Sequence, residues 1–128
     1  MKYITFKPEF AGLVERGEKL QTIRPTRARP FIVGEDVSLR QWSGKAYRSK
    51  QITLRTGKIK NVRQVVISRH PSNGQPRFWL QNVGFLNSVE INVMARLDGF
   101  CCIHAFMNFF ETVHELPFRG QLIQWKPL

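Results

Sequence analysis

Residues 31–69 decide the fold class of this 128-residue chain, and they read FIVGEDVSLRQWSGKAYRSKQITLRTGKIKNVRQVVISR. β-Branched and aromatic residues recur here with a period of two, which is typical of strands because successive side chains point to opposite faces. Gly34, Gly44 and Gly57 interrupt the pattern at the positions where turns are expected. The stretch therefore predicts strands over residues 31–33, 37–42, 47–55 and 62–68.

Shorter strands are predicted on either side, over residues 3–6, 21–24, 77–80 and 121–125. Pro8 is typical of the first turn of a helix, and Gly17 of the turn that follows one. A helical period returns near 88–97 and 101–113, where Phe106, Phe109 and Phe110 form an apolar stripe expected in the core.

The order of these elements predicts an α+β fold. We expect a mostly antiparallel sheet of about five to six strands, curled into a small barrel, with an N-terminal helix and one or two C-terminal helices against it. The length fits one domain spanning residues 1–128.

The net charge of +11 is concentrated in one part of the chain. Residues 19–69 hold thirteen Lys and Arg but only two acidic residues, whereas 1–18 and 70–128 are each neutral. Such an asymmetry favours a polyanionic partner, and nucleic acid is the first candidate. The alternative is a soluble basic protein without a polyanionic partner. A membrane surface is not expected, since the basic segment alternates like a strand rather than forming an amphipathic helix.

Residues 17–24, GEKLQTIR, hold the first candidate site. In an extended run Thr22 and Arg24 point to the same face, and Lys19 on the preceding turn can reach that face. A lysine of lowered pKa can act as the base for a hydroxyl nucleophile, and an arginine can bind a phosphate or an oxyanion. The alternative is a solvated Lys and Arg beside an ordinary strand threonine.

Residues 41–50 hold the second candidate site, around a predicted hairpin tip. Two aromatic residues, Trp42 and Tyr47, could stack on unpaired bases while Lys45, Arg48 and Lys50 contact phosphates. The alternative is an ordinary hairpin with Trp42 packed into the core.

The cysteines and histidines do not favour a metal site. Cys101 and His104 are three residues apart, but Cys102 faces elsewhere and His114 lies far along the helix. We expect no metal and no cofactor. Adjacent cysteines are poorly placed to pair with each other, and no apolar run is long enough to span a membrane, so a reduced, cytoplasmic protein is expected.

Five blocks of this sequence, in order, resemble the ASCH domain, a member of the PUA-like group of small β-barrels. They are KLQTIR (19–24), VGEDV (33–37), WSGK (42–45), LDGF (97–100) and LPFRG (116–120). The resemblance implies a groove between barrel and helices that binds RNA or a nucleoside. Members of the ASCH group include ribonucleases and RNA-binding modules.

Some bacterial ASCH proteins are amidohydrolases that remove the acetyl group of N4-acetylcytidine with a Lys, a Thr and a Glu. By motif, Lys19 and Thr22 match the first two, and Arg24 matches an accompanying arginine. Asp98 takes the place of the glutamate and is one methylene shorter, which puts its reach to a partner in question.

The sequence therefore favours three candidate functions, and it does not predict an oligomeric state. The first is binding of RNA or a modified nucleoside in a basic groove built from residues 19–69. The second is a hydrolase, an N4-acetylcytidine amidohydrolase or a ribonuclease, with Lys19, Thr22 and Asp98 as its catalytic set. The third is an interaction domain for an acidic protein. The candidate substrate-binding residues are Arg24, Arg27, Arg29, Trp42, Ser43, Lys45, Tyr47, Arg48 and Lys50.

Overall fold

The computed structural model describes residues 1–128, and it has seven strands and three helices. In chain order these are β1 (Lys2–Thr5), α1 (Pro8–Glu15), β2 (Gln21–Arg24), β3 (Asp36–Trp42), β4 (Gln51–Arg69), β5 (Pro76–Leu80), β6 (Gly84–Phe85), α2 (Ser88–Leu97), α3 (Ile103–Val113) and β7 (Phe118–Pro127). The predicted α+β class, the N-terminal helix and the two C-terminal helices are confirmed. No helix has both the length and the apolar composition needed to cross a bilayer.

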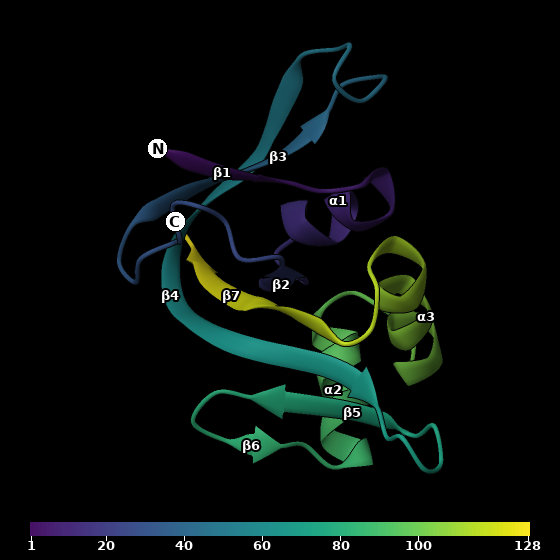
Figure 1. The fold of residues 1–128 in the computed structure, drawn as a ribbon. Coiled ribbons are helices and arrows are strands. Elements are labelled where there is room, and N and C mark those ends of the chain that lie inside the picture. Colours follow the sequence, from purple (N-terminus) through teal and green to yellow (C-terminus); the bar gives the residue numbers. More distant parts are fainter.

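All seven strands belong to one sheet, in which β4 is the central strand (Figure 1). One side of β4 pairs with β3 and then β5, the other side pairs with β7, and β2 lies on the far edge of β7. Only β1 and β3 run parallel, so the sheet is mostly antiparallel as predicted. The pairing does not close into a ring, and the two-residue strand β6 takes the count above the predicted five to six.

Two strand predictions are wrong. Residues 51–55 and 62–68, which were predicted to belong to two strands, are parts of the single strand β4, because Gly57 lies inside the strand. Residues 47–50, predicted to begin the first of these strands, lie in the loop before β4. A Cβ at Gly57 would lie 3.0 Å from Cδ1 of Trp125, so the glycine makes room for that ring rather than ending the strand. Residues 31–33 form no strand either. They lead into a turn where the Glu35 carboxylate accepts a hydrogen bond from the Ile32 backbone N–H at 2.6 Å.

Alternation along β4 and β7 gives the protein two cores. One face packs on α2 and α3, with Val65 and Leu122 among its buried residues, and Phe106 and Phe110 of the predicted stripe lie there. The other face packs on β1, β3 and α1, and Ile123 points into that second core. Figure 1 shows α2 and α3 beside the β4–β5 half of the sheet and α1 beside the β1–β3 half.

We predict that Gly120→Ala destabilises the fold by roughly 1–3 kcal/mol, as overpacked sites do. A methyl group at Gly120 would collide with the carbonyl oxygen of Arg24 on β2 and would lie 2.7 Å from Cζ of Phe118. Urea denaturation measures the effect. In the control Gly44→Ala, the nearest atom to the new methyl group is Cβ of Ser49 at 3.6 Å, so stability should be nearly unchanged. Equal stability of the two variants would contradict the prediction.

Candidate functional site

The turn after α1 directs Lys19 into the protein. Gly17 adopts a φ of 77°, a conformation that favours glycine, and the backbone N–H of Lys19 donates to the Leu13 carbonyl at 3.0 Å. The lysine side chain therefore points from the end of the helix into the protein, and Lys19 is only 2% exposed. A lysine this buried is uncommon unless it has a partner.

Strand β2 places Thr22 and Arg24 on one face, as the period of two predicts. Arg24 Nε donates to Thr22 Oγ1 at 3.0 Å, and Arg24 Nη2 donates to the Thr5 carbonyl at 2.9 Å. The hydroxyl of Thr22 therefore already accepts a hydrogen bond from a cationic group, and the guanidinium is fixed between two strands.

Asp98 reaches Lys19 in spite of its shorter side chain. It caps the C-terminal end of α2, and Gly99 follows it with a φ of 99°. Lys19 Nζ lies 3.3 Å from Asp98 Oδ1 and also donates to the backbone carbonyl oxygen of Asp98. Asp98 thus contacts the lysine through both its carboxylate and its main chain.

Lys19, Thr22, Arg24 and Asp98 all line one cavity of about 210 Å³. Its apolar wall comes from aromatic residues that the sequence did not identify as part of a site: Phe6, Phe10, Phe100 and Phe109. The ammonium of Lys19 lies 5.1 Å from the ring centre of Phe10, and the guanidinium of Arg24 lies 5.1 Å from that of Phe6. These cation–π contacts favour the charged forms of both groups.

Burial shifts the pKa values of the ion pair in opposite directions. It lowers the pKa of Lys19, although the Asp98 charge opposes the change, and it raises the pKa of Asp98 from 3.8 to about 6, although Lys19 opposes that change. Burial also lowers the pKa of Arg24. Perturbed groups of this kind, gathered in one cavity, are typical of functional sites.

A wider groove of about 650 Å³ adjoins the cavity and shares Thr5, Phe6, Lys7 and Arg24 with it. Trp42 and Tyr47 line the far part of this groove, with their ring centres 5.1 Å apart. Tyr47 is 88% exposed, and Trp42 belongs to neither core, so the alternative that buries Trp42 is wrong.

The remaining candidates do not converge on the cavity. Arg27 lies over the ring of Phe31 at 4.8 Å and, with Arg24, lines a third hollow of about 240 Å³. The other five line none of these cavities and are exposed around the groove and the preceding loop: Arg29, Ser43, Lys45, Arg48 and Lys50.

The arrangement offers an aromatic wall, a hydroxyl, two cationic donors and one carboxylate in a space that adjoins the wider groove. Such a site can stack a planar ring, donate hydrogen bonds to it and hold a negative charge nearby. No cluster of three or more His, Cys, Asp or Glu side chains is placed to hold a metal ion. Comparisons of this chain with protein-family models, with curated proteins and with solved structures find no match.

The raised pKa of Asp98 predicts a distinct pH dependence of stability. The folded protein holds the Asp98 proton more tightly than the unfolded chain, so the contribution of Asp98 to the free energy of unfolding falls as pH rises from about 4 to about 6. Asp98→Asn removes this contribution. Urea unfolding across that range should show wild-type stability declining relative to Asp98→Asn.

The matched control for this measurement is Asp36→Asn, which removes an exposed carboxylate paired with Lys58 at 3.1 Å. This variant should keep the wild-type decline. Parallel curves for wild type and Asp98→Asn would contradict the assignment of the decline to Asp98.

Proposed function

We propose that this protein is an ASCH-type, PUA-like domain that binds RNA or a modified nucleoside, with one base in the cavity and the adjacent strand along the basic groove. The supporting observation is that Lys19, Thr22, Arg24 and Asp98 line one cavity next to the groove of Trp42 and Tyr47. The curled sheet, with one helix on its first half and two on its second, is compatible with a PUA-like pseudobarrel.

The charge of the basic segment favours this proposal over a small neutral ligand. Of the thirteen Lys and Arg in residues 19–69, only Lys19, Lys58 and Arg69 form ion pairs. The other ten have no carboxylate partner within the protein. Phosphates of a nucleic acid would neutralise them, and the released counterions would favour binding.

A hydrolase is the second candidate, because Lys19, Thr22 and Arg24 line the same cavity. In this mechanism Thr22 Oγ attacks the acyl carbon of an N-acetylated base while Lys19 Nζ takes the hydroxyl proton. Arg24 stabilises the oxyanion, the carbon–nitrogen bond breaks, and the released amine takes the proton from Lys19. Water then hydrolyses the threonine ester to release acetate. Asp98 holds the lysine in place throughout.

Binding to a labelled single-stranded RNA tests the first proposal. If six or more phosphates are contacted, affinity should fall by at least ~300-fold between about 50 and 200 mM salt. Replacing Lys45, Arg48 and Lys50 together by Gln should reduce the slope of log affinity against log salt by about two, since each contact to a single strand contributes about 0.7. Fluorescence anisotropy measures both.

The control for this experiment is the triple variant Arg16→Gln, Arg96→Gln and Lys126→Gln, which makes the same change in net charge outside residues 19–69. It should leave the slope near the wild-type value. Equal effects of the two triple variants would reject the basic groove as the binding surface.

Incubation with N4-acetylcytidine, followed by mass spectrometry, tests the hydrolase. Thr22→Ala should lower acetate release by several orders of magnitude, as loss of a nucleophile does, while RNA affinity changes little. Thr22→Ser keeps the hydroxyl and should retain turnover. The mechanism is rejected if Thr22→Ala and wild type turn over the substrate equally.

A further inference from the structure

A hollow on the open face of the sheet shares no lining residue with the cavity of Lys19. It has a volume of about 990 Å³ and is formed mainly by β4, β5, β6 and β7. The helices α2 and α3 cover the other face of these strands, where Val65 and Phe78 are buried. The neighbouring residues along each strand, such as Val66 and Trp79, therefore point into this hollow.

The sheet register builds a row of side chains across this face. Arg119 of β7 pairs with Val66, Val66 with Trp79, and Trp79 with Phe85 of β6. Phe85 is 61% exposed and Trp79 is half-buried, so two aromatic side chains from neighbouring strands lie on the same uncovered surface. Arg77, on the same strand as Trp79, lies over the ring of Phe85 at 4.3 Å.

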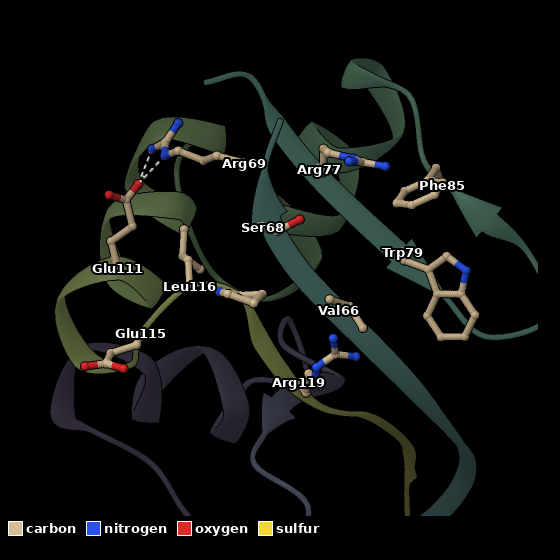
Figure 2. A pocket seen from close by; sticks show the side chains of 11 residues that line it. Val66, Ser68, Arg69, Arg77, Trp79, Phe85, Glu111, Glu115, Leu116 and Arg119 are labelled. Carbon is tan, nitrogen blue, oxygen red and sulfur yellow. Dashed lines mark hydrogen bonds and ion pairs between the residues drawn. The ribbon is translucent and has the colours of Figure 1, made fainter. Parts of the chain in front are cut away.

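The charges of this surface are separated. Figure 2 shows Arg77, Trp79 and Phe85 together at one end and Glu111 and Glu115 at the other. Glu111 is neutralised by an ion pair with Arg69. Arg77 and Arg119 form no ion pair and no side-chain hydrogen bond, so both guanidinium groups are free to bind an anion.

We propose that this surface, defined by Arg77, Trp79, Phe85 and Arg119, is a stacking platform for single-stranded RNA, separate from the cavity of Lys19. Exposed aromatic rings bind unpaired bases by stacking, and adjacent arginines bind the backbone phosphates. The platform extends the proposed RNA-binding function but uses none of its residues. An acidic or proline-rich peptide would use the arginines or the rings alone, whereas a nucleic acid strand uses both together.

Tryptophan fluorescence gives a direct test, because the chain has three tryptophans and each has a different environment. Trp125 is only 1% exposed, so in a Trp42→Phe variant the quenching caused by a bound base reports on Trp79. Titration of this variant with a short oligouridine should quench emission. Quenching should be absent when Trp79→Phe is added, and weak with double-stranded RNA, whose bases are already stacked.

Affinity measurements provide the second arm. Trp79→Ala should weaken oligouridine binding about tenfold, the effect of losing one stacked base. Arg119→Gln leaves the aromatic rings intact and should reduce the salt slope by about 0.7, whereas Arg96→Gln on α2, on the other side of the sheet, should not. Unchanged affinity in Trp79→Ala together with an unchanged slope in Arg119→Gln would overturn the platform.

The outcomes also separate this proposal from the basic groove. If the oligouridine binds and responds to the Lys45, Arg48 and Lys50 variant but not to Trp79 or Arg119, the platform is wrong and the groove stands. If it responds to Trp79 and Arg119 but not to the groove variant, the groove is wrong and the platform stands. If no RNA binds, both are wrong.

Discussion

The pairing of β4 with β7 is the constraint on which the rest of the structure depends. Ten residue pairs, from Gly57 with Pro127 to Ile67 with Phe118, hold the two strands in register. Because successive side chains alternate, this register sends Leu122 into one core and Ile123 into the other. A slip of one residue would exchange the two sets. β2, with Thr22 and Arg24, is attached to the free edge of β7, so the cavity is placed by the same register.

The buried pair of Lys19 and Asp98 is better explained by a site than by stability. Removing two charges from water costs several kcal/mol per ion, and the attraction between them offsets this only with good geometry and further hydrogen bonds. Here the 3.3 Å contact is joined by a bond to a main-chain carbonyl, and the pKa values of both groups still shift toward their neutral forms. A pair of apolar residues would fill this position at lower cost, so the pair is a local conflict of the kind expected where a ligand binds.

The local sequence pattern predicted those features of the fold and of the site that depend on residues close together in the chain. The period of two placed Thr22 and Arg24 on one face, and the turn at Gly17 brought Lys19 toward it. Nothing in spacing linked these residues to Asp98, which is 79 positions from Lys19, and only the family resemblance suggested it. The aromatic wall could not be distinguished from core, since Phe6 and Phe100 have the same sequence pattern in either role. The prediction that Gly57 ends a strand is wrong. The glycine is needed because the ring of Trp125 packs against it, and Trp125 belongs to a strand far away in the sequence.

The stacking platform was not predicted from the sequence either, because its residues are also brought together by strands that are separated along the chain. Its four residues come from three strands, and residues 70–128, which supply all of them, carry no net charge. Only the register of the sheet collects Arg77 and Arg119 on one face and leaves the acidic residues at the end of that face.

The two proposed surfaces meet at one short segment, since His114 lines the cavity of Lys19 and Leu116 lines the open hollow. Contacts of one strand at both surfaces would reinforce each other, because the second contact becomes intramolecular once the first has formed. Neither surface therefore has to bind tightly alone, which agrees with the small cavity and the short row of aromatic residues.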